Sequence, residues 1–386
     1  MFTVGIGQSE DPLASAAVSD VIDQVKKALG DVKPQAGLLF CSLDFDHAYI
    51  LSNIREAFPG IQIAGCTTDG ELSSVYGFTE DSVVLMAFAS DTAEISAGAG
   101  KEMSRNGKSA GRSAARSALE SLSRCAGEER FAVILSDPLN AGVSDVSSGM
   151  EEALGESFPL IGAASAAHSK LKTTYQFFND EVLTDSVVLL LFAGAVEYSF
   201  GVLGGHAPMG EKERITSSKK NVIYRIGGKP ALDYFRRYIG DKHSLFLNYC
   251  LAIYEEGRES FYVRSAPFSD EQTGSVTLNG VVEKGAMVQI GTADRNSCED
   301  SCAKSIRAAI ESYLGGKPSA ALFFSCAGRK MIMGRQVVKE TETAKRMLDN
   351  IPFCGFYSYG EFCPLERDGK PLFHGTTFVT LLIGGR

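Results

Sequence analysis

A short run of glycine, hydroxyl and carboxylate residues occurs near both ends of the chain. It extends from Gly65 to Glu71 and again from Gly355 to Glu361, and both runs read G-x-x-[ST]-x-G-E. Each follows a short apolar segment, so we expect each to be the exit of a buried strand into a turn that glycine permits. Such a turn presents hydroxyls that orient a small ligand and a carboxylate that accepts hydrogen bonds from an ammonium group.

Polar residues also follow other apolar segments that we expect to be strands. Because ligands of α/β sheets bind at the ends of strands, these polar residues are candidates for ligand contacts. Arg329 is the predicted anchor, because a guanidinium binds a carboxylate bidentately. With Glu71 or Glu361 accepting an ammonium group, the set suits a zwitterionic amino acid. The predicted ligand-binding residues are Thr67, Thr68, Glu71, Cys326, Arg329, Tyr357, Ser358 and Glu361. The structural alternative is that the glycines permit turns, the glutamates cap helices or pair with lysines, and Arg329 ties elements together.

The elements that must position these residues recur three times. Each copy has an apolar strand, an amphipathic helix, a strand leading to the turn, and a closing strand, with a further helix leading in. The first copy uses residues 38–40, 47–58, 65–71 and 81–88; the second uses 131–135, 146–158, 159–165 and 185–192; the third uses 321–324, 337–349, 355–361 and 376–383. Alternating strands and helices predict an α/β fold with mixed sheets built from repeated strand-helix-strand-strand units.

The length of 386 residues predicts two domains. Glycine and proline interrupt the pattern at residues 204–210. We therefore expect an N-terminal domain at 1–210 with two internal repeats and a C-terminal domain at 211–386 with the third. Within the second domain, residues 244–290 have β character, and a helix at 299–314 leads back to the third repeat.

Composition limits the possible partners and location. The net charge of −9 argues against a nucleic-acid groove, and the basic run at 212–220 is expected to be a solvated loop. No apolar stretch is long enough for a membrane span, and the amino end has no leader pattern, so we expect a cytoplasmic protein. The nine cysteines contain no C-x-x-C pair, which predicts packed thiols, although Cys298 and Cys302 have the spacing of half a metal site.

An enzyme that depends on a thiol is the competing hypothesis. Cys326 lies three residues before Arg329, whose charge would favour a thiolate nucleophile, and Cys66 lies in a turn rich in hydroxyls. The sequence shows no Cys-His-Asp order, and its glycine-rich segment at 201–210 precedes no clear helix, so it is not a phosphate-binding loop. We therefore expect a protein that is not an enzyme.

Several motifs in this order resemble the FIST (F-box and intracellular signal transduction) family over essentially the whole chain. The motifs are the runs 65–71 and 355–361, Gly205-x-x-Pro208-x-Gly210, Arg264-Ser265, Ser325-Cys326-x-Gly328-Arg329, Glu340, and the segment 374–377. The chain departs from the family pattern at His206, where an aromatic residue is usual, and at Gly375, where asparagine is usual.

The resemblance implies an intracellular sensor of a small molecule, an amino acid or a similar compound. Its signalling partner would be a separate histidine kinase, cyclase, phosphodiesterase or chemoreceptor, with no nucleic acid and no membrane insertion. Some family members bind haem and sense nitric oxide, so a haem sensor regulating a histidine kinase or a cyclic-di-GMP enzyme is the alternative. Its axial ligand would be His374 or, second, His206; the other candidates are His47, His168, His243, Cys66, Cys326 and Cys354.

Overall fold

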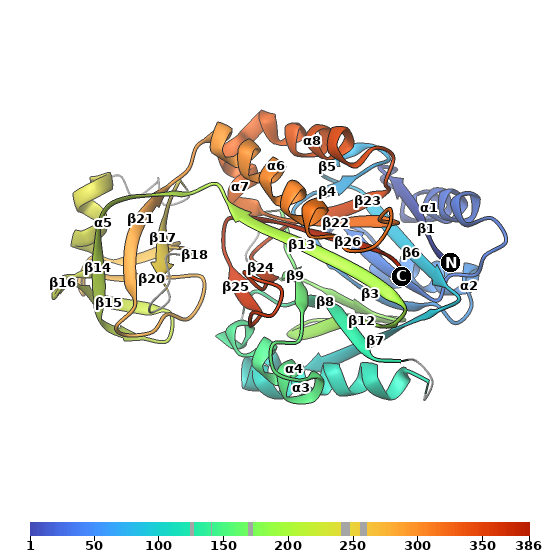
Figure 1. The fold of residues 1–386 in the computed structure, drawn as a ribbon, viewed down its shortest axis with the longest axis horizontal. Helices are drawn as coiled ribbons and strands as arrows, with labels where there is room; N and C mark the ends of the chain where they lie inside the picture. The colour runs from blue at the N-terminus through green and yellow to red at the C-terminus, as the bar shows by residue number, and fades with distance from the viewer. Residues whose placement is uncertain (124–126, 140, 169–172, 241–247, 255–260) are drawn as a thin grey trace.

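The computed structural model describes residues 1–386 except 124–126, 140, 169–172, 241–247 and 255–260. The chain forms a body of three repeats and a module, residues 207–292, that is inserted into the third repeat (Figure 1). In the described part, each repeat supplies the core of one six-stranded sheet, and the module has a sheet of its own. The predicted α/β class with mixed sheets is therefore confirmed.

The elements of the body follow one plan three times. Repeat one comprises β1 (Phe2–Ser9), α1 (Ala14–Leu29), β2 (Ala36–Cys41), α2 (His47–Ala57), β3 (Gln62–Thr67), β4 (Glu71–Ser73), β5 (Gly77–Thr79) and β6 (Val83–Ser90). Repeat two comprises β7 (Ala93–Lys101), α3 (Met103–Ser121), β8 (Glu129–Ser136), the 3₁₀ helix η1 (Ala141–Ser144), α4 (Val146–Leu154), β9 (Leu160–Ala164), β10 (Gln176–Phe178), β11 (Glu181–Leu183) and β12 (Ser186–Gly194). Repeat three comprises β13 (Val196–Gly204), α6 (Arg295–Glu311), β22 (Ala320–Cys326), α7 (Ala327–Met333), the 3₁₀ helix η3 (Gly334–Val337), α8 (Val338–Leu348), β23 (Phe353–Ser358), β24 (Glu361–Cys363), β25 (Leu372–His374) and β26 (Thr377–Gly385).

The four long strands of every repeat have the same order, β1-β6-β2-β3, β7-β12-β8-β9 and β13-β26-β22-β23. The last two strands in each order run parallel, and the other neighbours run antiparallel. The parallel pair packs closely, since a Cβ at Gly162 of β9 would lie 1.9 Å from the carbonyl oxygen of Ile134 on β8. The glycines at 65 and 355 meet the neighbouring strand in the same way. This contact explains the first glycine of the repeated motif.

The three repeats exchange their short hairpins in a closed ring. Hairpin β4–β5 of repeat one pairs with β23 of repeat three, β24–β25 of repeat three pairs with β9 of repeat two, and β10–β11 of repeat two pairs with β3 of repeat one. Each six-stranded sheet therefore contains two strands from another repeat. Every repeat is therefore hydrogen-bonded to both others.

Alternating side chains of the strands build the core. On β2, Leu38 and Phe40 face a core shared by all three sheets, whereas Leu39 and Cys41 face the covering helices. The helices supply the matching apolar faces; α1, for example, buries Val18 together with other residues at helical spacing. None of the described helices is long and apolar enough to cross a membrane.

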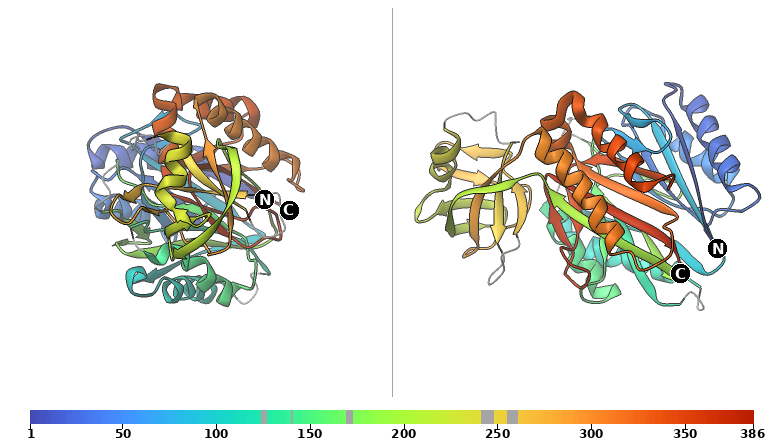
Figure 2. Two further views of the ribbon diagram at one scale, coloured as in Figure 1. Left: turned by 90° about the vertical axis from the view of Figure 1, so that its left-hand side faces the viewer. Right: turned by 45° about the horizontal axis from the view of Figure 1, so that its top comes forward.

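The module consists of β14 (Ala207–Lys219), β15 (Val222–Ile226), β16 (Lys229–Pro230), α5 (Ala231–Ile239), β17 (Tyr249–Tyr254), β18 (Phe261–Ser265), β19 (Phe268–Asp270), β20 (Ser275–Thr277) and β21 (Met287–Thr292). It has a separate apolar core and projects from one end of the body (Figure 2). The chain passes between the two parts twice, from β13 into β14 and from β21 into α6.

Two local predictions were wrong. The basic run at 212–220 lies mostly in β14 rather than in a loop, because its backbone pairs with β15 and β21. The helix predicted to begin at residue 299 begins at Arg295, where the Asp294 side chain accepts a hydrogen bond from the Ser297 backbone N–H at 2.8 Å. The third repeat takes β13 from before the predicted domain boundary at residue 210, and the division into 1–210 and 211–386 stays a prediction.

Candidate functional site

The G-x-x-[ST]-x-G-E turns lie at the points where the hairpins pass from one repeat to the next. Glu71 begins β4 opposite Phe356 of β23, and Glu361 begins β24 opposite Ala163 of β9. The equivalent residue of repeat two is Gln176, which begins β10 opposite Cys66 of β3. The position that holds glutamate in repeats one and three therefore holds glutamine in repeat two.

Each of these three side chains is fully buried and hydrogen-bonded to a hydroxyl at the end of the preceding strand. Glu361 accepts hydrogen bonds from Ser358 Oγ at 2.6 Å and from Thr377 Oγ1 at 2.7 Å. Glu71 accepts hydrogen bonds from Thr68 Oγ1 and from Ser82 Oγ, and Gln176 donates to Ser165 Oγ. The repeated motif thus fastens the exchanged hairpins, which is a structural role.

Burial raises the pKa of both glutamates although their hydroxyl partners oppose the shift. The pKa of Glu361 rises to about 7 and that of Glu71 to about 8. Both carboxyl groups therefore titrate near neutral pH.

Arg329, the predicted anchor, is also fully buried. Its Nε and Nη2 donate to Glu340 Oε1 at 3.1 and 2.7 Å, and its Nη1 donates to Ser301 Oγ at 2.8 Å. The Tyr357 hydroxyl donates to the second oxygen of Glu340. These contacts connect α6, α7, α8 and β23. They match the structural role that the sequence left open for Arg329. We therefore place no ligand on Arg329 or Tyr357.

A cleft of about 660 Å³ lies between the module and the body, at the strand ends of repeats two and three. The body contributes Leu139, Cys326, Met331, Ser358, Tyr359 and Thr376 to its wall. The module contributes Lys220, Ser265, Phe268, Asn279, Gly280 and Val281. The volume is within the usual range of about 300–1,000 Å³ for small-molecule sites.

Of the eight predicted ligand-binding residues, Cys326 and Ser358 line this cleft, and Glu361 is bonded to Ser358. Thr67, Thr68 and Glu71 do not join them; they occupy the equivalent turn of repeat one, where Thr67 Oγ1 accepts a hydrogen bond from a backbone N–H. The structure thus divides the predicted set among three places. Only the part from repeat three borders the cleft.

The thiol of Cys326 is in surroundings that disfavour nucleophilic chemistry. Burial raises its pKa well above the ordinary value, and the neighbouring Glu361 charge raises it further. A thiol of this kind is protonated at neutral pH and is a poor nucleophile.

The histidines considered as haem ligands do not fit that group in this structure. His374 is buried with Nε2 at 2.7 Å from the Cys363 carbonyl oxygen, and burial lowers its pKa to about 4. His206 is buried with Nδ1 at 3.3 Å from Thr376 Oγ1. Neither imidazole lines the cleft. His47 is bonded to the Ser42 carbonyl, and His243 lies outside the described residues.

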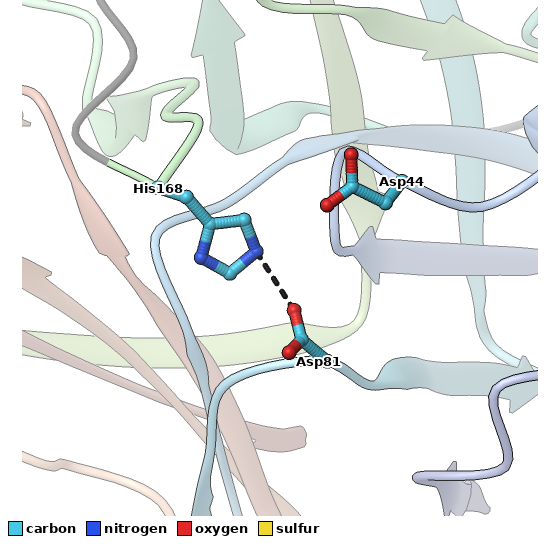
Figure 3. A group of neighbouring side chains, drawn as sticks. All are labelled: Asp44, Asp81 and His168. Atoms are coloured by element: carbon cyan, nitrogen blue, oxygen red, sulfur yellow. Dashed lines mark ion pairs between the residues drawn. The ribbon is translucent and has the colours of Figure 1, made fainter.

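A separate group of ionisable side chains comprises Asp44, Asp81 and His168 (Figure 3). Their ligand atoms lie within 4.8 Å of one another, a spacing that a single divalent cation can bridge. However, His168 Nε2 already lies 3.0 Å from Asp81 Oδ1 and 2.8 Å from Ser42 Oγ, and both carboxylates are exposed. The same nitrogen faces both Ser42 and Asp81, so the group is not a relay of the Ser-His-Asp type.

Sequence reasoning missed the module side of the cleft and Gln176. Gln176 follows Ser165 by eleven residues, whereas Glu71 and Glu361 follow their hydroxyl residues by three, so the fixed spacing of the motif concealed it. The module residues lie in short strands and turns with no repeat to mark them. Asparagine and glycine at 279–280 were the available signal.

Known proteins resemble this chain in structure and in sequence. A cyanuric acid hydrolase from A. caulinodans has a TM-score of 0.41 at 10% identity, covering 100% of this chain and 99% of its own. Another cyanuric acid hydrolase has a TM-score of 0.33 at 10% identity, with both chains covered completely. At these scores the likeness bears on neither the fold nor the chemistry of this chain.

Two sequence relatives are uncharacterized mycobacterial proteins. One, from Mycobacterium tuberculosis (strain H37Rv), is 28% identical over 234 residues, which are 56% of this chain and 59% of the relative. The other, from Mycobacterium bovis, is 27% identical over 232 residues, 56% of this chain and 58% of the relative. The chain thus spans less than two thirds of the length of these relatives.

Two adjoining family profiles match the chain. The FIST N domain matches residues 35–229, and the FIST C domain matches residues 231–364. The chain therefore belongs to the FIST family.

Proposed function

We propose that this protein senses a small, largely apolar molecule, an amino acid or a related compound, that binds in the cleft between the module and the body. The observation that carries the proposal is the exposure of apolar side chains on both walls of one cleft. Phe268 and Val281 of the module are 61% and 38% exposed, and Met331 and Leu139 of the body are 57% and 38% exposed. Exposed apolar groups that converge on a hollow favour an apolar ligand.

Polar groups at the strand ends would orient this ligand. Ser358 and Thr376 offer hydroxyls from the body, and Ser265 offers a hydroxyl from the module. A ligand that contacts both walls has a higher affinity for a closed arrangement than for an open one. It therefore shifts the population toward closure by the amount of that difference.

The signal would pass to a separate protein in the cytoplasm. The two chain crossings between β13 and β14 and between β21 and α6 are short, so a rotation of the module about them changes the surface at the junction. A histidine kinase, a cyclase or phosphodiesterase, or a chemoreceptor that binds only one arrangement would register the ligand. The body, with its closed ring of hairpins, stays rigid during this change.

A single indole placed in the cleft tests the proposal. The chain contains no tryptophan, so Phe268→Trp supplies the sole indole of the protein. Ligand that covers it is expected to shift its emission to shorter wavelength, in a titration against amino acids and small organic acids. Tyr224→Trp is the matched control, because Tyr224 is an exposed aromatic residue of the module that does not line the cleft.

The proposal fails if a compound stabilises the protein against heat while the emission of Phe268→Trp stays constant, because the compound then binds elsewhere. It also fails if no compound of the panel changes either signal.

A further inference from the structure

Arg264 is a buried cation that has no counter-ion among the residues that the structure describes. It lies on β18 of the module and is 6% exposed, and its Nε and Nη1 have no hydrogen-bond partner among the residues that the structure describes. Its guanidinium stacks over the ring of Tyr262 at 4.6 Å, which satisfies no N–H donor. Burial lowers its pKa to about 10, so it is still charged at neutral pH.

Arg329 shows how the same chain completes a buried guanidinium when the role is structural. Its donors reach the carboxylate of Glu340, the hydroxyl of Ser301 and the carbonyl of Cys298. Removing a charge from water without such partners is strongly unfavourable. For Arg264, no acceptor in the described structure offsets this desolvation cost. A buried guanidinium in this state is typical of a binding site in which the ligand supplies the acceptor.

The guanidinium lies behind the wall of the cleft, because Arg264 contacts a lining residue without being one itself. It packs against Gly280, where a Cβ would meet Nε at 2.7 Å and Cζ at 3.1 Å, and Gly280 is a lining residue. The adjacent Asn279 also lines the cleft, and its Oδ1 is buried without a donor among the described residues. Ser265, the neighbour of Arg264 on β18, lines the same wall.

The charges around the cleft favour an anion over a cation. Of the described residues that line it, Lys220 alone is charged, and no aspartate or glutamate is among them. This local excess of positive charge occurs in a chain whose net charge is −9. Glu361 lies behind Ser358, where its oxygens are already bonded to Ser358 and Thr377.

From these observations we propose that the cleft takes a small carboxylate with an apolar body, and that Arg264 binds the carboxylate group. The inference rests on the proposed function and narrows it, because the apolar walls set the body of the ligand and Arg264 sets its charge. A free ammonium group is not needed and finds no acidic side chain on the wall. The carboxylate supplies an acceptor to the guanidinium; because Nε–H and Nη1 lie on different edges, it pairs with one edge at a time.

Four compounds with one body test this proposal by calorimetric titration of the full chain. They are 3-phenylpropanoate, its neutral amide, phenylalanine and phenethylamine. We expect 3-phenylpropanoate to bind about tenfold to a hundredfold more tightly than the amide. Phenylalanine should bind no more tightly than 3-phenylpropanoate, and phenethylamine most weakly.

Arg264→Met separates ligand binding from a structural role. It should reduce the affinity for 3-phenylpropanoate to that for the amide and leave the affinity for the amide unchanged. Because it removes an unpaired buried charge, it should not lower the Tm of the ligand-free protein. The control is Arg225→Met, which removes the same charge from an exposed position of the same module and should leave all affinities unchanged.

The possible results distinguish the two proposals. Equal binding of acid and amide, or equal weakening of both by Arg264→Met, overturns the role of Arg264 and leaves the cleft as a binding site. A lower Tm of the ligand-free Arg264→Met protein, with unchanged affinities, assigns Arg264 to structure. If none of the four compounds binds, both the carboxylate proposal and the cleft as the site of such ligands fall.

Discussion

Replacing the buried glutamates by glutamine should make this protein more stable at alkaline pH. Burial raises the pKa of Glu71 to about 8 and of Glu361 to about 7. The unfolded chain holds the same groups near pKa 4.3. Between these values the folded state binds more protons than the unfolded state, so stability is greatest at acid pH and falls as the pH rises through the folded pKa. Glutamine resembles the protonated acid and does not titrate.

The size of the effect follows from the shifts. One pKa unit corresponds to about 1.4 kcal/mol. Between pH 5 and pH 9 the wild type should therefore lose about 4 kcal/mol through Glu71 and about 3 kcal/mol through Glu361. For a chain of this length, 1 kcal/mol moves the Tm by about 1 °C. We expect Glu71→Gln and Glu361→Gln to match the wild type at pH 5 and to exceed it by several degrees together at pH 9.

Scanning calorimetry at intervals of half a pH unit measures these curves, and the difference between variant and wild type isolates each glutamate. The subtraction is needed because His374, whose pKa is lowered to about 4, contributes stability of the opposite sign, which rises with pH up to about 6.5. Gln176 shows that an amide is compatible with this position, since it bonds Ser165 Oγ at 2.8 Å. Curves that run parallel at all pH values would refute the reasoning, because the glutamates would then be charged throughout.

Three further results are expected. Arg329→Met should lower the free energy of unfolding by about 3–5 kcal/mol, because Glu340 is left buried and unpaired, while the double variant with Glu340→Leu should recover much of the loss in chemical denaturation. Iodoacetamide should modify Cys326 far more slowly in the native protein than in urea, as mass spectrometry of the peptide can show; equal rates would contradict the raised pKa. Gly162→Ala should destabilise the body strongly, since its Cβ would lie 1.9 Å from the Ile134 carbonyl oxygen; an unchanged Tm would show that the parallel strands can separate.

The repeats could be predicted because their signal is local. β2 and β12 are continuous apolar runs in the sequence, and both strands form where they were expected. The hairpin exchange could not be predicted. β4, β10 and β24 are three residues long, and their partners belong to other repeats, so no periodicity reveals the pairing.

The candidate site was predictable in part for the same physical reason. Cys326 and Ser358 end strands that the apolar pattern identifies, and they border the cleft. Arg329 also follows such a strand, but its guanidinium forms an ion pair with Glu340 on α8. This tertiary contact cannot be read from the order of residues in the sequence. Nothing in the sequence distinguishes Arg264 from other arginines; what distinguishes it is burial without a hydrogen-bond partner for Nε and Nη1 among the described residues.

The ring of exchanged hairpins bears on the proposed closure of the cleft, because it leaves the module as the part that would move. Every repeat is bonded to both others, whereas the module is joined to the body through two chain crossings and the contacts around residues 374–376. Closing the cleft on a ligand would cover the exposed parts of Phe268 and Met331, and each contributes about 1–2 kcal/mol on burial. A few kcal/mol of differential affinity is sufficient to convert a minor state into the major one. Under the proposed function, a rigid body with one moving wall directs the free energy of ligand binding into a single motion.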